Sequence, residues 1–182
     1  MNPEMFTQSM QQVLQTAQLQ AQKNQHQQLS VWHVLHALLE SSNSLGSRLL
    51  EKAGANLKSF QEACTLEIQR HPKVSGTADQ MYLSSELAQA LELAQENAKK
   101  IKDKYTSVDM VMLALSVTSP TKEFFQKHNI SPSKLNTIVN DMRKGQSMDT
   151  QTADENLESL DRYAKDLTEV ARKGKLDPVI GR

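Results

Sequence analysis

Two histidines one helical turn apart, His33 and His36, are the residues whose type and spacing could hold a metal ion. Imidazole is a common zinc ligand, but a zinc site needs three or four ligands, and no cysteine or carboxylate pattern completes this one. A buried helix explains the pair better, with one histidine packed and the other at the helix edge. A small helical enzyme or metal protein built on His33 and His36 therefore stays open as one reading.

The single cysteine, Cys64, lies on an apolar helical stripe, which favours a small core residue over a nucleophile. One cysteine permits no internal disulfide, which is typical of a reducing compartment, and we expect a cytoplasmic protein. The sequence contains no phosphate-binding Gly-x-x-x-x-Gly-Lys-Ser/Thr loop, no Gly-x-Gly-x-x-Gly, no Cys-x-x-Cys and no nucleophile elbow. We therefore predict that this chain has no catalytic residues, no metal and no cofactor of its own.

The amino-acid composition further narrows the class of protein. The 182 residues carry 21 basic and 21 acidic side chains, and this balance argues against a dedicated nucleic-acid partner. No run of about 18 apolar residues exists to span a membrane, and the first residues lack a signal-peptide pattern. Few glycines and aromatics, with many Ala, Leu, Gln, Glu and Lys, predict an all-α fold.

The elements that would position any site come from a duplication. Ser30 precedes an apolar helical pattern as a cap, and the same pattern returns after Ser107, at an offset of 77 residues. In the later half the offset falls to 75. The sequence thus predicts an eight-helix domain over residues 1–145, made of two four-helix repeats (about 1–72 and about 80–145) with pseudo-twofold symmetry.

The character of the chain changes after this domain. Residues 146–156 are polar without apolar periodicity and predict a flexible linker. A last amphipathic helix is expected over about 157–173, so that 157–182 would form a helix and the truncated start of a further module. The apolar Val-Ile near the end favours a chain that continues.

The duplicated unit resembles one family through two further stretches. These are Pro72-Lys73-Val74-Ser75-Gly76-Thr77 between the repeats and the ending Gly174-Lys175-Leu176-Asp177-Pro178-Val179-Ile180-Gly181-Arg182. Together they resemble the ClpB-type AAA+ disaggregases. The resemblance implies the Clp N-terminal repeat domain plus the connection into the first ATPase module.

The function implied by this resemblance is first contact with exposed apolar segments of unfolded or aggregated proteins, before an ATP-driven machine threads them. The parent would be a homo-hexamer that uses ATP and Mg²⁺ and works with a DnaK-type chaperone system, whereas this fragment would be a monomer. The alternative within the family is an adaptor-docking N-domain of a ClpA/ClpC-type protease-linked unfoldase.

The resemblance also implies site residues, transferred position by position. The polar set for substrate is Thr7, Asp103 and Asp109, and Leu93 and Met110 are groove members. The residues expected near the nucleotide in the parent are Val179, Ile180, Gly181 and Arg182. Asp109-Met110 departs from the Glu-His usual in the family. Leu93 lies off the main apolar stripe of its helix and is free to face outward, whereas Asp109 is also explained as an acidic residue in a first helical turn.

Overall fold

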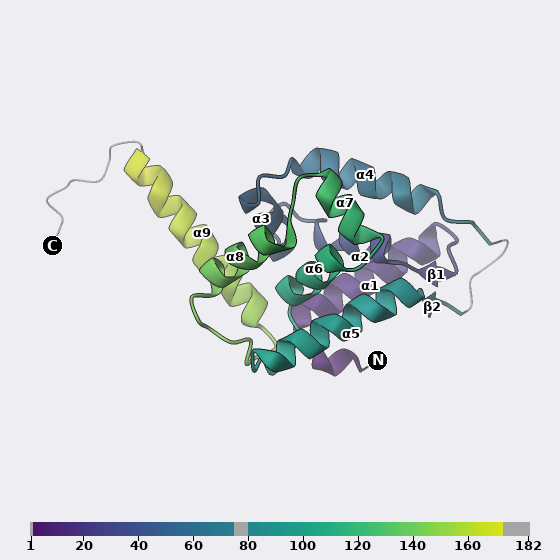
Figure 1. Cartoon of the computed structure of the whole chain (residues 1–182), viewed down its shortest axis with the longest axis horizontal. Helices are drawn as coiled ribbons and strands as arrows, with labels where there is room; N and C mark the ends of the chain where they lie inside the picture. Colours follow the sequence, from purple (N-terminus) through teal and green to yellow (C-terminus); the bar gives the residue numbers. More distant parts are fainter. Residues whose placement is uncertain (1, 75–79, 173–182) are drawn as a thin grey trace, which may run out of the picture.

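The computed structural model describes residues 2–74 and 80–172, and their regular secondary structure is almost entirely helical (Figure 1). The elements in chain order are η1 (Pro3–Met5), α1 (Gln8–Lys23), β1 (Gln28–Leu29), α2 (Val31–Leu38), α3 (Leu45–Lys52), α4 (Leu57–Gln69), β2 (Tyr82–Leu83), α5 (Ser85–Lys100), α6 (Val108–Val117), α7 (Thr121–Lys127), α8 (Pro132–Arg143) and α9 (Ala153–Arg172). Within these ranges no helix combines the length and apolarity needed to cross a bilayer. The all-α prediction is confirmed.

Local sequence signals explain where the helices begin and end. The Ser30 hydroxyl accepts a hydrogen bond from the Trp32 N–H at 3.2 Å, and the Asn56 side chain accepts one from the Ser59 N–H at 3.0 Å. Both bonds satisfy donors that a helix leaves free in its first turn. Gly54 and Asn129 follow α3 and α7 in left-handed conformation, with φ of 88° and 61°, which ends each helix. These four positions agree with the sequence pattern.

The first helical segment of the chain is interrupted. Asn2 caps only the short η1, and α1 begins anew at Gln8 with Thr7 as its cap. Between them Phe6 is extended, fully buried and paired with Thr106 in a parallel bridge. Burial of this aromatic ring and the backbone bond to the second repeat outweigh the continuation of the helix.

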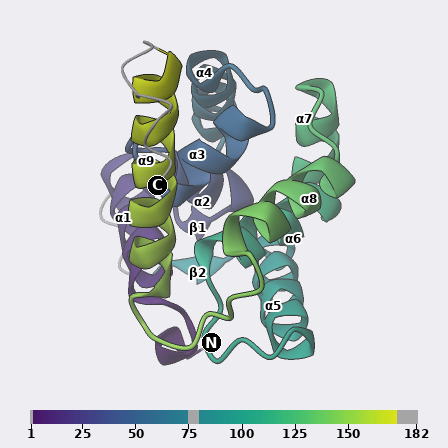
Figure 2. The same cartoon turned by 90° about the vertical axis from the view of Figure 1, so that its left-hand side faces the viewer.

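The two repeats are related through their backbone pairings. The offset of 77 residues equates Phe6 with Leu83 and Leu29 with Thr106. The structure pairs Phe6 with Thr106 and Leu29 with Leu83, both in parallel, so each pairing is the image of the other. Figure 2 shows α1–α4 on one side, α5–α8 on the other, and β1 and β2 near the middle. This arrangement is the one expected of a pseudo-twofold axis between the repeats.

Aromatic side chains pack where the repeats meet. The Phe60 ring on α4 makes edge contacts with Phe124 and Phe125 on α7, at centroid distances of 4.9 and 5.5 Å. Trp32 on α2 meets Phe124 at 4.9 Å. Because each partner comes from a different repeat, these contacts join the two units into one core.

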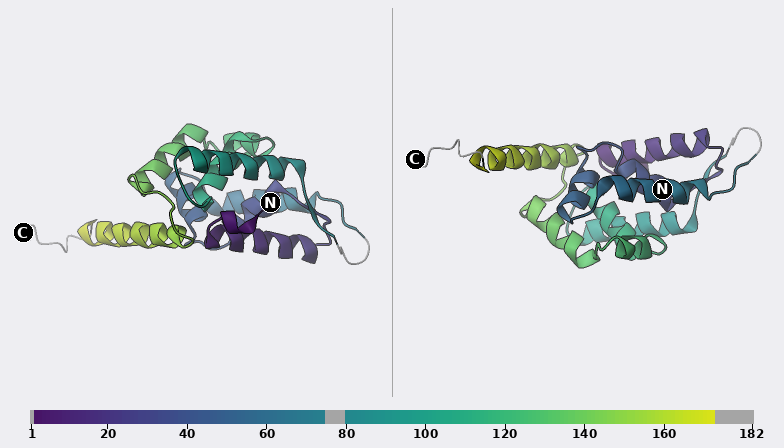
Figure 3. Two further views of the ribbon diagram at one scale, coloured as in Figure 1. Left: turned by 90° about the horizontal axis from the view of Figure 1, so that it is seen from below. Right: turned by 90° about the horizontal axis from the view of Figure 1, so that it is seen from above.

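The segment expected to be a flexible linker is held against the domain. Helix α9 begins at Ala153, inside the predicted linker, and Met148 and Leu157 are buried. Only the later part of α9 projects from the end of the domain (Figures 1 and 3). The sequence of this segment shows no apolar periodicity, because most of its contacts with the domain are hydrogen bonds of backbone groups and carboxylates.

The aromatic junction predicts that the repeats unfold together. Phe60→Ala should lower the free energy of unfolding by about 3–5 kcal/mol, since it removes a buried ring and leaves a cavity. Leu66→Ala, on the same helix but 59% exposed, is the matched control and should cost about 0.5 kcal/mol or less. Chemical denaturation followed by circular dichroism should show one transition in both variants. Two separate transitions in Phe60→Ala would contradict a shared core.

Candidate functional site

A buried cluster of charges surrounds Arg143, in the last turn of α8. Its guanidinium donates two hydrogen bonds to the Asp109 carboxylate, at 2.7 and 2.8 Å, and one to Asp103 at 2.9 Å. A further donor reaches the Ser107 hydroxyl at 3.0 Å. Asp109 lies in the first turn of α6, and Asp103 and Ser107 lie in the loop before it. One cation therefore joins the end of the second repeat to the start of its buried helix.

Asp154 of α9 completes this cluster, which we call the polar network (Thr7, Asp103, Ser107, Asp109, Arg143 and Asp154). The Thr7 hydroxyl donates to Asp154 Oδ2 at 2.5 Å, and the Val108 N–H donates to the same oxygen at 3.2 Å. The carboxylate is fully buried, and Asp154 Oδ1 has no hydrogen-bond partner among the described residues.

The electrostatics of the network follow from burial and like charge. Burial, and then the nearby Asp109 carboxylate, raise the pKa of Asp154 to about 7, against the hydrogen bonds from Thr7 and Val108 and the charge of Arg143. Burial alone would lower the pKa of Arg143, but its bonds and proximity to Asp109 and Asp103 raise it overall. Arg143 therefore stays charged, while Asp154 exchanges a proton near neutral pH.

The structure brings together the polar residues that the resemblance implied, but it places them inside. Thr7, Asp103 and Asp109 are 0%, 8% and 2% exposed, and Asp103 and Asp109 face Arg143 rather than solvent. Met110, in the same turn of α6, is 5% exposed. Leu93 is half-buried in the middle of α5, where it packs against the core. Residues 179–182 lie outside the described residues.

Ser107, Arg143 and Asp154 are the members of the network that the sequence reading did not assign to the site, and the last two carry its charge. Arg143 reads as one of several cations at a helix end, and Asp154 lies in a polar stretch without period. Neither has a local signal, because their partners lie between 34 and 147 residues away in the chain. An arginine at the end of an amphipathic helix, at a position that the apolar face of the helix also covers, was the one available hint.

The histidines form a second buried cluster, and its geometry argues against a metal. His33 lies beside His26 and His71, with ring centroids 5.2 Å from each. The Ser30 backbone N–H donates to His33 Nδ1 at 3.0 Å, so the ring hydrogen of neutral His33 sits on Nε2 and faces His26 Nδ1, also at 3.0 Å. Both nitrogens of His33 are thus engaged, and neither offers a free lone pair for a ligand.

Within the described ranges, no group of three or more His, Cys, Asp or Glu side chains is arranged to hold a metal. His36, the other half of the predicted pair, is half-buried and does not join the cluster. Cys64 is fully buried in the core, and burial raises the pKa of its thiol, which keeps it protonated. In the structure, His33, His36 and Cys64 therefore pack against their neighbours.

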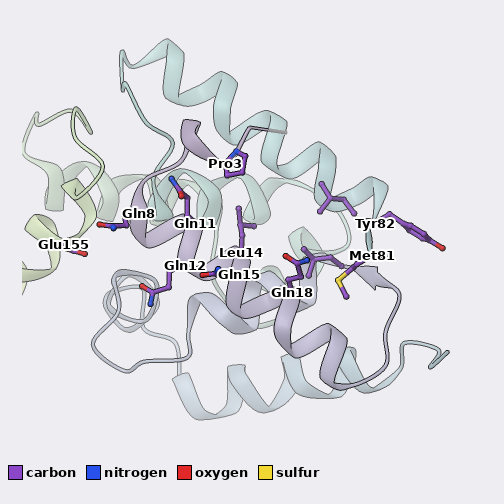
Figure 4. Close-up of a pocket in the computed structure, with 12 residues that line it drawn as sticks. Pro3, Gln8, Gln11, Gln12, Leu14, Gln15, Gln18, Met81, Tyr82 and Glu155 are labelled. Atoms are coloured by element: carbon purple, nitrogen blue, oxygen red, sulfur yellow. The ribbon is translucent and has the colours of Figure 1, made fainter. Parts of the chain in front are cut away.

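A groove lies along the outer side of α1, beside β2, and has a volume of about 760 Å³ (Figure 4). Its lining residues are Pro3, Gln8, Gln11, Gln12, Leu14, Gln15, Gln18, Leu29, Met81, Tyr82, Leu83 and Glu155. Glutamine amides from successive turns of α1 stand beside an apolar strip from α1, β1 and β2. Glu155 of α9, at one end, is the one charged residue in this lining. None of the five residues expected to meet substrate lines this groove.

Comparison with known proteins identifies one family, and the similar proteins described below agree with it. A family model described as the Clp repeat (R) N-terminal domain matches residues 5–128. The chain is 39% identical over its whole length to the chaperone protein ClpB of Brucella suis biovar 1, and 33% identical to ClpB of Meiothermus ruber. It spans about a fifth of the length of these relatives, 21% and 20%.

Solved structures share the fold. The N-terminal domain of Hsp104 from Candida albicans superposes with a TM-score of 0.74 at 23% identity, over 82% of this chain and 98% of that one. A complex of the ClpV N-domain with a VipB peptide matches with a TM-score of 0.63 at 16% identity, over 81% of this chain and 92% of that one.

The histidine cluster predicts a loss of stability in mild acid. Burial, followed by the charges of His71, His26 and His36, lowers the pKa of His33 to about 3, so the folded chain excludes a proton that the unfolded chain binds below about 6.5. This contribution is complete above pH 6.5 and declines as the pH falls. At pH 5.5 the lost stability from His33 should be about 1.4 kcal/mol.

Denaturant titrations between pH 7.5 and 5.5 test this. Over this range the free energy of unfolding of the unsubstituted chain should fall by about 1.4 kcal/mol relative to that of His33→Gln, whatever the stability of the variant itself. Equal slopes in His33→Gln and the unsubstituted chain would show that the buried imidazole does not exclude the proton.

Proposed function

This chain belongs to the Clp repeat N-terminal domain family, and on that premise we propose that it is the substrate-binding domain of a ClpB-like disaggregase. In this role it binds exposed apolar segments of unfolded or aggregated polypeptides before they are threaded. The remainder of the protein would form the hexameric AAA+ ATPase, with ATP and Mg²⁺ held there, and would cooperate with a DnaK-type chaperone in the cytoplasm. The ClpB relatives, which extend well beyond this chain, support that expectation.

The groove along α1 is the observation that carries the proposal. Its apolar strip, which includes Leu14, Met81 and Leu83, would gain free energy from covering apolar side chains. Each glutamine amide offers both donors and acceptors, and these match the N–H and C=O groups of any extended peptide backbone. A lining that contacts the peptide backbone and apolar side chains, and that carries little charge, suits a site that must accept varied sequences.

The exposed ring of Tyr82 extends this surface. It is 54% exposed and stands at one end of the groove, opposite the end at which Glu155 stands (Figure 4). Tyrosine supplies a large, rigid and amphipathic contact area at low conformational cost. We expect it to cover an apolar side chain of the bound segment.

A defined adaptor peptide is the second candidate ligand. The ClpV N-domain was solved with a VipB peptide, and a protein of this fold therefore takes up a peptide of one partner. For this chain the corresponding reading is an adaptor-docking N-domain of a ClpA/ClpC-type unfoldase. Tight binding of one sequence with rejection of unrelated apolar peptides would favour it over the proposed general capture.

Leu93 and Met110 remain proposed substrate contacts, with different consequences of substitution. Leu93 is half-buried, and Leu93→Gln should leave folding nearly intact. Met110 is 5% exposed, so Met110→Gln would bury an amide and lower stability, which makes it a poor test of binding. A contribution of Leu93 would require a second contact region outside the α1 groove.

The groove predicts a loss of binding when charge is introduced along α1. The double variant Gln15→Glu/Gln18→Glu keeps side-chain size but places carboxylates beside the apolar strip, where a bound apolar peptide would desolvate them. Affinity for an uncharged fluorescent peptide of leucine, alanine and serine, measured by anisotropy, should fall on the order of tenfold. Both side chains are exposed, and the melting temperature should stay nearly unchanged.

Gln69→Glu/Gln126→Glu is the matched control, since it adds the same two charges at exposed positions on α4 and α7. It should bind the peptide as the unsubstituted chain does. Equal affinity of all three proteins, or equal weakening of both double variants, would place the binding site elsewhere. An NMR titration of the chain with the same peptide should shift the α1 amides first.

A further inference from the structure

The chain between α8 and α9 is bonded to the loop between α5 and α6 and to the start of α1. Asp103 Oδ1 accepts the Met148 N–H at 3.0 Å, and the Met148 carbonyl accepts the N–H groups of Lys104 and Tyr105, both at 3.1 Å. The Gln8 N–H, at the first residue of α1, donates to the Gln151 carbonyl at 2.8 Å. We call residues 147–161 the connector.

The start of α9 continues this attachment through three carboxylates on one face. Asp154, Glu158 and Asp161 are spaced so that they share a face of the helix. Glu158 accepts the Leu45 N–H at 2.9 Å, in the first turn of α3, as Asp154 accepts that of Val108 in the first turn of α6. Carboxylates at helix N-termini are favourably placed for the helix dipole.

Asp161 ends the series. It forms ion pairs with Arg48 and Lys52 of α3, both at 2.9 Å. Burial would raise the pKa of Asp161, but these two cations lower it overall. Leu157, between the carboxylates, is 4% exposed and adds apolar contact. The connector thus meets the domain through polar groups spread along its length, together with buried apolar contacts of Met148, Ala153 and Leu157.

Polar contacts of this kind are reversible. If the connector left, water would replace its hydrogen bonds, and Asp154, whose Oδ1 lacks a partner among the described residues, would regain full hydration, while Met148 and Leu157 would become exposed. We propose that the polar network is a latch, which holds the connector against the domain and releases it as one unit. The latch gives Thr7, Asp103 and Asp109 a role toward the connector.

The connector also borders the groove. Gln8 and Gln11 line it, and Gln11 donates to the Gln151 side chain at 3.3 Å, while Glu155 of α9 forms its end. This link depends on the proposed function: if the groove binds peptide, then occupant and connector share these residues. Occupancy would then change the docking equilibrium, and docking would change affinity by the same factor.

Docking is expected to take up a proton. The charged groups that face Asp154 are Asp109 of α6 and Arg143 of α8, and burial next to Asp109 raises the pKa of Asp154 to about 7 from its ordinary 3.8. The docked state therefore binds more protons than the released state between these values, and docking strengthens as the pH falls. From pH 8 to pH 6 the docking equilibrium should shift by about tenfold.

Hydrogen exchange of single amides, followed by NMR on the full chain, tests the latch. The amides of Gln8, Lys104 and Tyr105 donate to connector carbonyls and report docking directly. The amides of Thr7 and Thr106 donate to Thr106 and Met5 carbonyls and are internal controls. In Asp154→Ala the three reporters should exchange on the order of tenfold to a hundredfold faster, with the controls unchanged.

Asp149→Ala is the matched control variant, because Asp149 lies on the same segment but is exposed. It should leave all five amides unchanged. Uniform acceleration of reporters and controls in Asp154→Ala would indicate a loss of folding; the second variant, Asp161→Ala on the outer turn, should then still accelerate the reporters alone. Unchanged reporters in both α9 variants would overturn the latch.

Asp154→Asn tests whether the Asp154 carboxyl group takes up the proton on docking. In the unsubstituted chain the protection factors of the three reporters should rise about tenfold between pH 8 and pH 6, and in Asp154→Asn they should not change with pH. A pH response that survives in Asp154→Asn would overturn the role of Asp154. Peptide affinity is measured separately, so a latch that opens in a chain without peptide binding would count against the groove and not against the latch.

Discussion

The fold depends on one buried cation. Arg143 is 5% exposed, and a guanidinium in that position is tolerated only because carboxylates and a hydroxyl take up its donors. Its partners lie at the start of α6 and in the loop before it, so the bonds fix where α8 ends relative to the buried helix of the same repeat. Loss of either Asp103 or Asp109 would leave buried guanidinium N–H donors without an acceptor, which is costlier than the loss of an exposed pair.

The same cluster makes the connector an extension of the domain. Asp103 binds Arg143 and the Met148 N–H with one oxygen, and Asp154 adds a further carboxylate beside Asp109. Asp103 and Asp109 already balance the single positive charge of Arg143. Asp154 is therefore held by hydrogen bonds from the Thr7 hydroxyl and the Val108 N–H rather than by attraction to a net positive charge. The attachment is therefore sensitive to protons and salt in a way that the apolar core is not.

The sequence predicts the parts of this molecule that depend on local pattern. Caps such as Ser30, helix ends such as Gly54, and the offset between the repeats all leave signals within a few residues or at a fixed interval. The polar network leaves none, because a single carboxylate such as Asp154 looks the same whether it faces water or Thr7, 147 residues away. The sequence did not predict the groove for a related reason. Glutamines on a helix are typical of a solvent-exposed face, and only the folded structure shows that β2 lies beside them.

The duplication has a consequence for how such a domain diverges. Gln25 and Lys102 occupy equivalent positions and share a left-handed backbone, with φ of 61° and 64°. The residue after each begins a buried polar cluster, His26 in the first copy and Asp103 in the second. The same bend thus precedes a neutral imidazole pair in one half and an ionic junction in the other. Protons weaken the imidazole cluster, whereas they bind to Asp154 of α9 beside the ionic junction, so acid acts with opposite sign on two structurally equivalent positions.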